Sequence, residues 1–331
     1  MSKLDKKKFA PIFIIGMPRS GTKLIREILN NHKHIYIPRA ESIFLPFLVH
    51  KYGLKPNFNS LYQINRITKD ILRSSFFYHM KIPKSKIINK EFVDVLKSNR
   101  WDLIFKYLIH DSLNQNINKK IFGDKTPSYI NNIDILSKIY PSANFLHIIR
   151  DPRDQSLSIK KVWGKNLYRN AFKWRSDIFR CRNFAKENNI NYFEVRYEDL
   201  ITNSKKTMID VCKYLSCDFS ESMLIFNKPV ENLGDAKDLY INSNNMNKFK
   251  DKLSFSQIKK IEELTLDVMC QLKYIPVNSN ISLRKLSLTE TYIYKILDYF
   301  NIVKFHIMEK GIFKGLRYVY SLNHQNFKKY I

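Results

Sequence analysis

Glycine and proline are scarce in this chain, with 8 and 11 of its 331 residues, respectively. We therefore expect loops that are few, or that are built from Asn, Ser and Asp instead. Apolar residues make up 44% of the chain and aromatic residues 14%, which excludes a disordered chain and allows a sizeable core. The length suits one large α/β domain, or a domain with an appendage.

Cysteine is rarer still. The four cysteines form no CxxC pair, and no histidine partner stands at the spacing of a zinc site: Cys181, Cys212, Cys217 and Cys270. This scatter argues against a disulfide framework and against a metal centre. It predicts reduced, buried thiols of the kind found in the cytosol.

Long hydrophobic runs are missing as well. No segment approaches the roughly 18 apolar residues of a transmembrane helix, and the charged residues 1–9 lack the apolar centre of a signal peptide. We therefore predict a cytoplasmic protein that can reach a membrane only from its surface.

Acidic side chains are fewer than basic ones. The chain has 57 Lys and Arg but only 30 Asp and Glu, which gives a net charge of +27. The excess fits an anionic partner such as a nucleotide, an acidic polymer or a membrane surface. It fits equally well a compositional drift in a chain rich in Lys, Asn and Ile. The basic residues form no recognition helix and no RNA-binding motif, so we do not expect nucleic acid as a partner.

Strand and helix patterns alternate along the chain. Pro11–Gly16 and Asn144–Ile149 are short apolar runs typical of buried strands, Tyr192–Arg196 is predicted as a third strand, and Thr22–Asn31 has helical spacing. Ile121–Gly123 fits either a short strand or a turn. Such alternation predicts a P-loop-like, three-layer α/β/α fold around a mostly parallel central sheet.

Two further regions flank this pattern. Residues 42–120 are largely helical in pattern, and we interpret them as a helical insertion in a domain spanning residues 1–278. Residues 279–331 form a basic helical C-terminal extension, with apolar side chains at helical spacing: Tyr292, Ile293, Ile296, Leu297, Phe300 and Val303. One interpretation is a membrane-surface or partner-binding helix. We favour an ordinary helix packed back on the domain, because amphipathic surface helices are the norm.

The segment Gly16-Met-Pro-Arg-Ser-Gly-Thr-Lys23 joins the first strand to the first helix. Free N–H groups and the positive dipole at a helix N-terminus favour a phosphate there. Arg19 adds a planar fork that suits phosphate oxygens, and Thr22 adds a hydroxyl. In nucleotide triphosphatases a lysine directly follows the glycine, and a hydroxyl residue follows the lysine. Here the order after Gly21 is reversed, so neither the lysine nor the hydroxyl residue is placed for its role in such an enzyme. A glycine turn without a ligand is the alternative, and the coincidence of strand, glycine, arginine and helix disfavours it.

A second anion site is indicated near the middle of the chain. Arg150 ends a predicted strand, and Ser158 follows eight residues later on the next helix. Ligands of open α/β sheets bind at the carboxyl ends of the strands, where an arginine and a hydroxyl can share one phosphate. A structural ion pair of Arg150 with Asp151 or Asp154 is the alternative.

Together these motifs resemble the sulfotransferase family. Pro18-Arg-Ser-Gly-Thr22 is similar to its 5′-phosphosulfate loop, and Arg150 with Ser158 is similar to its 3′-phosphate site. The resemblance implies 3′-phosphoadenosine 5′-phosphosulfate (PAPS) as the donor and no metal. It further implies these donor-binding residues: Arg19, Ser20, Gly21, Thr22, Lys23, Arg150, Ser158, Tyr197 and Lys248. Lys23 departs from the family, which usually has threonine there, and Phe249 replaces a common tryptophan.

The same resemblance implies the catalytic residues. Glu41, about twenty residues after the loop, resembles the base of the tyrosylprotein branch, and Lys125 lies in a similar Gly123-Asp-Lys-Thr-Pro127 segment. Glu41 would take the acceptor proton, while Arg19 and Lys125 would stabilise charge on the leaving nucleotide. Glu41 could instead cap or pair on the following helix, and Lys125 could be a solvated surface lysine. Four histidines are alternative bases: His32, His34, His110 and His147, of which His147 better fits a packed core.

We thus predict an enzyme that transfers a sulfonate group from PAPS to an acceptor hydroxyl by in-line displacement and releases 3′,5′-ADP. A glycan or glycolipid acceptor is favoured, and a peptide tyrosine or a small metabolite stays open. The basic extension provides for peripheral membrane contact. Two alternatives of other classes remain, a P-loop kinase or nucleotide triphosphatase and a non-enzymatic anion-binding module.

Overall fold

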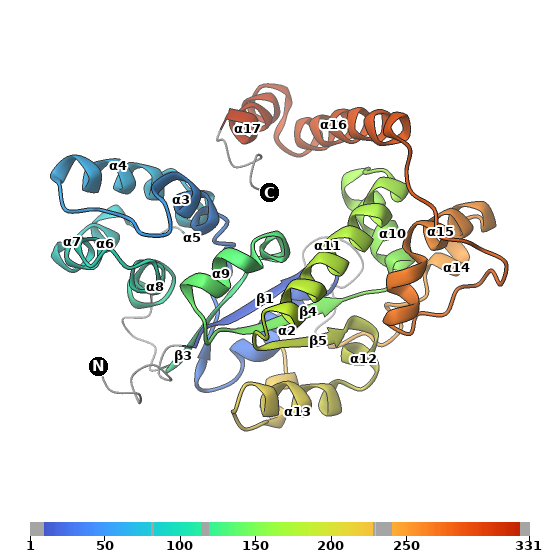
Figure 1. The fold of residues 1–331 in the computed structure, drawn as a ribbon, viewed down its shortest axis with the longest axis horizontal. Helices are drawn as coiled ribbons and strands as arrows, with labels where there is room; N and C mark the ends of the chain where they lie inside the picture. The colour runs from blue at the N-terminus through green and yellow to red at the C-terminus, as the bar shows by residue number, and fades with distance from the viewer. Residues whose placement is uncertain (1–9, 81–82, 114–118, 228, 230–239, 325–331) are drawn as a thin grey trace.

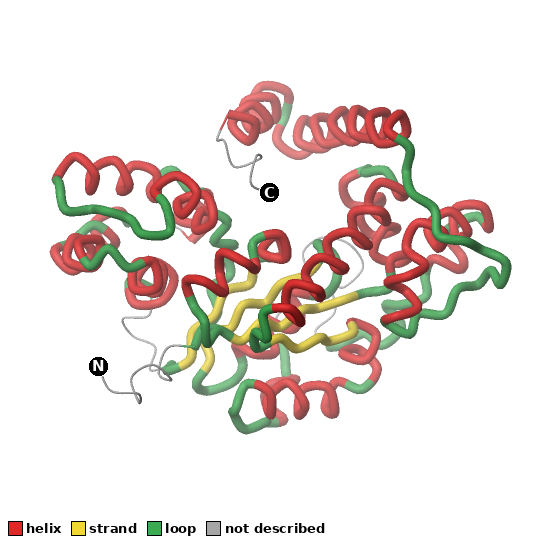
Figure 2. Tube along the Cα trace, viewed as in Figure 1, coloured by secondary structure: helices red, strands yellow, loops and turns green. Residues whose placement is uncertain are grey.

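A computed structural model describes residues 10–80, 83–113, 119–227, 229 and 240–324 (Figure 1). Within these residues one five-stranded sheet forms, in the order β2-β3-β1-β4-β5, with every neighbouring pair parallel. The strands are β1 (Ile12–Gly16), β2 (Ile35–Tyr36), β3 (Ile121–Lys125), β4 (Asn144–Ile149) and β5 (Tyr192–Arg196). Helices cover both faces of the sheet (Figure 2), which confirms the predicted three-layer α/β/α fold.

The helices fall into two layers around this sheet. One layer holds α2 (Thr22–Asn30), α12 (Tyr197–Thr202) and α13 (Ser204–Tyr214). The other holds α9 (Ile133–Ile139) and the long α11 (Leu167–Glu187), which crosses in front of the sheet in Figure 1. Beyond them lie α10 (Pro152–Trp163), α14 (Phe249–Lys252) and α15 (Phe255–Gln271).

Side chains of β1 alternate between two cores because successive residues of a strand point to opposite faces. Ile12 and Ile14 pack in the core that contains the apolar residues of α2 and α13. Phe13 and Ile15 pack in the core that contains Trp174 of α11. A continuous apolar run at β1 is therefore required by burial on both faces, as expected for a central parallel strand.

The predicted strands are confirmed, and Ile121–Gly123 proves to be a strand that extends to Lys125. The edge strand β2 was missed because two residues carry no detectable periodicity. The spacing Ser254-x-x-Gln257 predicts a capping box, which is confirmed, since the Ser254 side chain accepts from the Gln257 N–H. The sequence also offers Asn203 as the N-cap of α13, but its side chain makes no cap hydrogen bond there.

Helices occupy most of the segment between β2 and β3. They are α3 (Phe44–Tyr52), α4 (Leu61–Leu72), α5 (Ser75–Met80), α6 (Lys84–Ile87), α7 (Lys90–Lys97) and α8 (Trp101–Lys106). The spacing of Trp101, Ile104 and Leu108 predicts a single helix over Trp101–Leu113, but α8 gives way to a π-helical turn at Tyr107–Asp111. Their apolar faces share one core with Phe13 of β1, so this segment packs directly against the sheet domain.

The C-terminal extension forms two helices, α16 (Leu288–Lys310) and α17 (Ile312–His324), along the upper edge of the view in Figure 1. The helix α16 contacts the domain, as the favoured interpretation expects. Its apolar stripe, however, is turned away from the domain, since Tyr292 is 67% exposed and Phe300 63% exposed. Residues 325–331 of the predicted extension lie outside the described part of the chain. Among the residues that the structure describes, no helix is both long and apolar enough to cross a membrane.

The cysteines are all free thiols, as predicted. Cys181 and Cys212 are buried, but Cys270 is exposed and Cys217 is partly exposed. The prediction that these thiols are buried is therefore wrong for the last two.

Strand order determines where the predicted site residues meet. The loop after Gly16 leaves the central strand β1, which lies between β3 and β4. Lys125 ends β3 and Arg150 follows β4 directly. Because the strands are parallel, all three segments emerge at the same edge of the sheet.

Candidate active site

The loop between β1 and α2 needs two of the few glycines. Gly16 has a φ of +152°, and a Cβ there would lie 2.5 Å from the Ile148 carbonyl oxygen. Gly21 has a φ of +92°, and a Cβ there would lie 2.4 Å from the Tyr197 ring. Both positions combine a backbone conformation that favours glycine with a close approach that any side chain would block. The loop is therefore held tightly between β4 and the start of α12.

Polar groups of this loop face the start of α2. Ser20 is fully buried, and its Oγ has no hydrogen-bond partner among the described residues. The Pro18 carbonyl accepts a hydrogen bond from Gln155 Nε2 at 2.7 Å, which ties the loop to α10. Thr22 is buried at the first position of α2, and Lys23 is partly exposed beside it. A buried hydroxyl without a partner at a helix N-terminus fits an anionic ligand.

Arg19 and Ser158, which the sequence assigned to opposite ends of the donor, contact each other directly. Arg19 Nε donates to Ser158 Oγ at 3.2 Å. Arg150 is buried, and its guanidinium donates to the Arg19 carbonyl at 3.3 Å. The two predicted phosphate sites therefore adjoin each other at this edge of the sheet.

Arg150 is surrounded by further contacts. Its guanidinium lies 4.5 Å from the Tyr197 ring centroid and donates to the Asn245 carbonyl at 2.9 Å. Its Nε is buried without a hydrogen-bond partner in the described structure. Asp154 lies 3.9 Å away, so the ion pair considered from the sequence exists, although it is long. Arg150 thus keeps donor capacity for an anion, as a phosphate-binding arginine requires.

Asn245 was not singled out from the sequence. Its Nδ2 donates to the Tyr197 hydroxyl at 2.8 Å. Tyr197 therefore links three parts of the site, because its ring packs against Gly21 and Arg150 while its hydroxyl binds Asn245. Lys248 is partly exposed at the N-cap of α14, and its donor-binding role stays a prediction.

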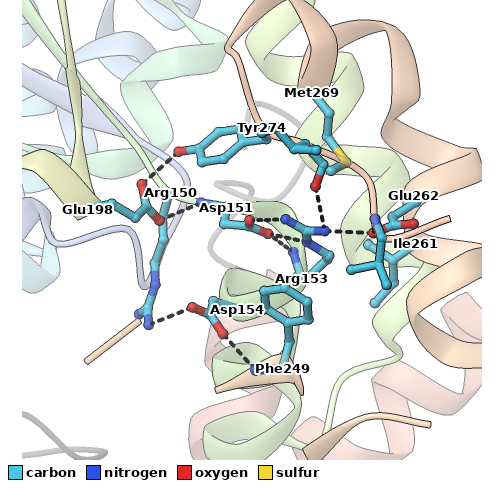
Figure 3. Close-up of polar contacts among 12 residues, drawn as sticks. Arg150, Asp151, Arg153, Asp154, Glu198, Phe249, Ile261, Glu262, Met269 and Tyr274 are labelled. Atoms are coloured by element: carbon cyan, nitrogen blue, oxygen red, sulfur yellow. Dashed lines mark hydrogen bonds and ion pairs between the residues drawn. The ribbon is translucent and has the colours of Figure 1, made fainter. Parts of the chain in front are cut away.

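A buried polar network behind Arg150 fixes the first turn of α10 (Figure 3). Asp151 caps that helix and pairs with Arg153 at 2.6 Å, and Arg153 also pairs with Glu262 at 2.6 Å. The Asp151 N–H donates to Glu198 at 3.0 Å, and the Tyr274 hydroxyl donates to the same carboxylate at 2.8 Å. Each charged group of this network thus has an ionic or a hydrogen-bond partner, as burial in low-dielectric surroundings requires.

Asp154 extends this network toward the end of the chain. It accepts the N–H of Phe249 at 2.9 Å, which places the start of α14 against α10. Phe249, where the family often has tryptophan, is buried and lies under the Arg153 guanidinium at 4.1 Å from the ring centroid. The Arg-Asp-Pro-Arg-Asp motif after β4 therefore does more than supply Arg150, since it also holds α14 and α15 in place.

Glu41 and Lys125 form an ion pair at the same edge of the sheet. The Lys125 side chain is 1% exposed whereas that of Glu41 is 37% exposed, so a solvated surface lysine is a wrong interpretation. Burial lowers the pKa of Lys125, and the nearby charges of Arg26 and Lys23 lower it further, while Glu41 raises it. The lysine thus reaches the carboxylate from the inside and leaves the carboxylate accessible from solvent.

A sequence profile of the sulfotransferase family matches residues 11–221. The chain belongs to the sulfotransferase family. Relatives include protein-tyrosine sulfotransferase 1 of Danio rerio, 23% identical over 220 residues, which cover 64% of this chain and 55% of that protein. Nodulation protein NoeE of Sinorhizobium fredii is 24% identical over 152 residues, which cover 46% of this chain and 31% of NoeE. This chain therefore spans only about half or less of these two relatives.

Solved structures agree with this family at the level of the fold. A sulfotransferase domain from the curacin biosynthetic pathway superimposes with a TM-score of 0.56 at 19% identity, covering 80% of this chain and 98% of that domain. A sulfotransferase domain from the Synechococcus PCC 7002 olefin synthase gives a TM-score of 0.51 at 21% identity, with 76% and 93% covered.

The histidines of this sulfotransferase make poor alternatives to Glu41. His147 is fully buried in β4 beside the Tyr192 hydroxyl, and burial lowers its pKa to about 3. His32 and His34 follow the C-terminal end of α2, at the end of that helix opposite to the phosphate loop. His110 pairs with Asp111 in the π-helical turn. A packed core role for His147 is confirmed.

Asp124, next to Lys125, was not predicted and is buried in a hydroxyl network. It accepts from the hydroxyl groups of Ser42 and Thr126, and Ser42 also contacts the Tyr129 hydroxyl at 2.7 Å. Burial raises the pKa of Asp124 to about 7 from an ordinary value of 3.8. This network positions the chain between Glu41 and α3, because Ser42 directly follows Glu41.

The raised pKa of Asp124 predicts a pH-dependent stability. A carboxyl that binds its proton more tightly when folded stabilises the fold fully below about pH 4, and that contribution is lost as pH rises toward 7. Replacing Asp124 with Asn should remove this loss, so the variant should gain on the order of a few kcal/mol relative to wild type between pH 4 and 8. Urea unfolding of both proteins across this range measures the difference.

Asp94→Asn is the matched control, because Asp94 is exposed on α7. That variant should follow the wild-type pH dependence. Parallel curves for wild type and Asp124→Asn would show that Asp124 does not titrate in this range.

Proposed function

We propose that this sulfotransferase transfers a sulfonate group from PAPS to an acceptor hydroxyl and releases 3′,5′-ADP. The observation that carries the proposal is the convergence of two anion-binding groups, the loop at Ser20 and the guanidinium of Arg150, around Tyr197. A donor with phosphate at both its 5′ and 3′ positions needs two such groups. Buried polar atoms without partners at both places support this fit.

The chain's own residues supply alignment and charge. In the proposed reaction the bond from sulfur to the 5′-phosphate oxygen breaks while a bond from sulfur to the acceptor oxygen forms. Glu41 takes the hydroxyl proton, and Lys125 orients the Glu41 carboxylate through their ion pair. Arg19, fixed by Ser158, stabilises the charge that develops on the leaving phosphate.

The acceptor that we propose is a glycan or a glycolipid. The half-exposed Glu41 carboxylate is open to an acceptor from solvent. Relatives in Danio rerio and Caenorhabditis briggsae carry the names of protein-tyrosine sulfotransferases, so a peptide tyrosine is the second candidate. A cytoplasmic location and independence from metal ions stay predictions.

Ligand-dependent thermal stability tests the donor. We expect 3′,5′-ADP to raise the melting temperature by several degrees, because a ligand at 100 times its Kd adds about 2.7 kcal/mol. ATP with Mg²⁺ should have little effect, and a protein stabilised only by ATP with Mg²⁺ would be a kinase or triphosphatase instead. A protein that binds polyanions in a salt-dependent way without responding to either nucleotide would be a non-enzymatic module.

Labelled donor then tests the reaction. PAPS carrying radioactive sulfur, with a glycolipid extract or a tyrosine peptide, should label the former in the presence of EDTA. Labelling of the peptide alone would reject the proposed acceptor and keep the proposed reaction. Loss of all labelling in EDTA, with recovery on added Mg²⁺, would reject metal independence.

A further inference from the structure

The polar face of α16 is turned toward the domain. Asp298 is buried, accepts the Asn166 N–H at 2.6 Å and pairs with Arg169 at 2.5 Å. Asn301 Nδ2 donates to the Gly164 carbonyl at 2.7 Å. A surface helix of a globular domain usually buries its apolar stripe and exposes its polar face. In α16 this arrangement is reversed.

The apolar face of α16 is consequently exposed. Large exposed apolar side chains recur at helical spacing over the first three turns or so of α16: Leu288, Tyr292, Ile293, Ile296, Leu297, Tyr299 and Phe300. Most of these positions were recognised in the sequence as one stripe. An exposed apolar patch of this extent on a soluble domain indicates an interaction surface.

Lysines lie at both edges of this apolar face. At about 100° per residue, Lys295 falls beside Leu288 at one edge of the apolar arc and Lys304 falls next to Leu297 near the other, and both lysines are exposed. Glu290 also lies near Leu297, but its charge is paired with Lys260 at 2.9 Å and with Arg284 at 2.9 Å. The outer surface therefore combines apolar side chains with flanking positive charge.

The second helix continues the same character. Gly315 of α17 is buried against α16, and a Cβ there would lie 2.6 Å from the His306 carbonyl oxygen. This close crossing leaves Ile312 and Phe313 exposed, the latter at 88%. Lys314 is exposed between them and Gly315. The two helices thus form one hairpin with a basic and apolar outer surface.

We propose that the α16–α17 hairpin binds the surface of an anionic lipid bilayer, with its apolar face in the boundary between headgroups and acyl chains. Aromatic and aliphatic side chains flanked by lysines are the features by which interfacial helices bind such surfaces. A second copy of the chain fits less well, because pairing two of these faces would bring lysine flanks against lysine flanks. The proposal does not depend on the donor or the acceptor.

Vesicle co-sedimentation tests the apolar face. Wild-type protein should sediment with vesicles of phosphatidylcholine and phosphatidylglycerol, and Ile293→Ser/Phe300→Ser should weaken this binding at least tenfold. Ile225→Ser/Phe255→Ser is the matched control, since these side chains are similarly exposed elsewhere, and it should bind like wild type. Unchanged melting temperatures confirm that every variant is folded.

A second pair of variants tests the contribution of the flanking lysines to vesicle binding. Lys295→Gln/Lys304→Gln should weaken binding to anionic vesicles about 30-fold, from about 1 kcal/mol per lysine, and should leave weak binding to pure phosphatidylcholine unchanged. Lys206→Gln/Lys213→Gln removes two exposed lysines of α13 and should have no comparable effect.

Three outcomes would overturn the proposal. The first is no binding of wild-type protein to anionic vesicles, and the second is binding of the hairpin variants as strong as that of their controls. The third is a dimer, seen by light scattering, that Ile293→Ser/Phe300→Ser dissociates, without vesicle binding by wild type. A failure of 3′,5′-ADP to stabilise the protein would reject the proposed function and leave this result unaffected.

Discussion

Replacing Glu41 with Gln is expected to reduce kcat by about 10²–10⁴-fold, the usual contribution of a positioned general base. The amide keeps the size of the side chain but cannot take up the acceptor proton. Donor affinity should change little, because Glu41 contacts Lys125 rather than the phosphate loop. Steady-state transfer of labelled sulfonate, with 3′,5′-ADP binding measured in parallel, separates the two effects.

Two controls distinguish a lost base from a disturbed site, since the variant also removes the partner of buried Lys125. Glu187→Gln changes an exposed glutamate at the end of α11 and should behave like wild type. Glu41→Ala should regain part of its turnover with added formate, whereas Glu41→Gln should not. Full turnover in Glu41→Gln would remove Glu41 from the proposed role.

Replacing Arg150 with Ala is expected to weaken 3′,5′-ADP binding by about 10–100-fold, because a hydrogen bond to a charged group contributes about 1.5–3 kcal/mol. The reason is geometric, since the buried guanidinium lies between the Arg19 carbonyl and the Tyr197 ring and retains an Nε without a partner. Titration calorimetry measures the loss directly.

Comparing the binding of two nucleotides provides an internal control for Arg150→Ala. If Arg150 binds the 3′-phosphate, Arg150→Ala should lose affinity for 3′,5′-ADP and keep the weak affinity of wild type for 5′-AMP, which lacks that group. Arg150→Lys should fall between the two, because it keeps a charge but loses the planar fork. Equal losses for both nucleotides would instead indicate that the variant damages the loop at Arg19.

Local sequence was sufficient for the central part of the fold. The strands β1 and β4 are mainly apolar because both faces of the sheet are buried there. The edge strand β5 is only partly buried, and the positions of all three could be predicted to within a residue. The edge strand β2 was not predictable, because two residues leave no period. The π-helical turn after α8 was not predictable either, because it keeps the apolar side chains of the expected helix and changes only the hydrogen bonding.

Those site residues could be predicted that belong to a motif at the carboxyl end of a strand. The loop, Arg150 and Lys125 follow three adjacent parallel strands, so the topology brings them together. Asn245, Asp124 and the partners of Arg153 were missed, because their roles arise from contacts between segments far apart in the chain. The face of α16 that contacts the domain was not predictable for a similar reason. A helical period shows that a helix has two faces, but not which of them the domain contacts.

The contacts of the Arg-Asp-Pro-Arg-Asp segment bear on where the smallest working unit of this protein ends. Family similarity stops at residue 221, yet Asn245 binds Arg150, Phe249 binds Asp154, and Glu262 pairs with Arg153. A chain cut at the border of family similarity would remove one of the two carboxylates that pair with buried Arg153 and the Asn245 carbonyl that accepts from Arg150. The contacts that complete the candidate site therefore extend to at least Tyr274, whose hydroxyl binds Glu198.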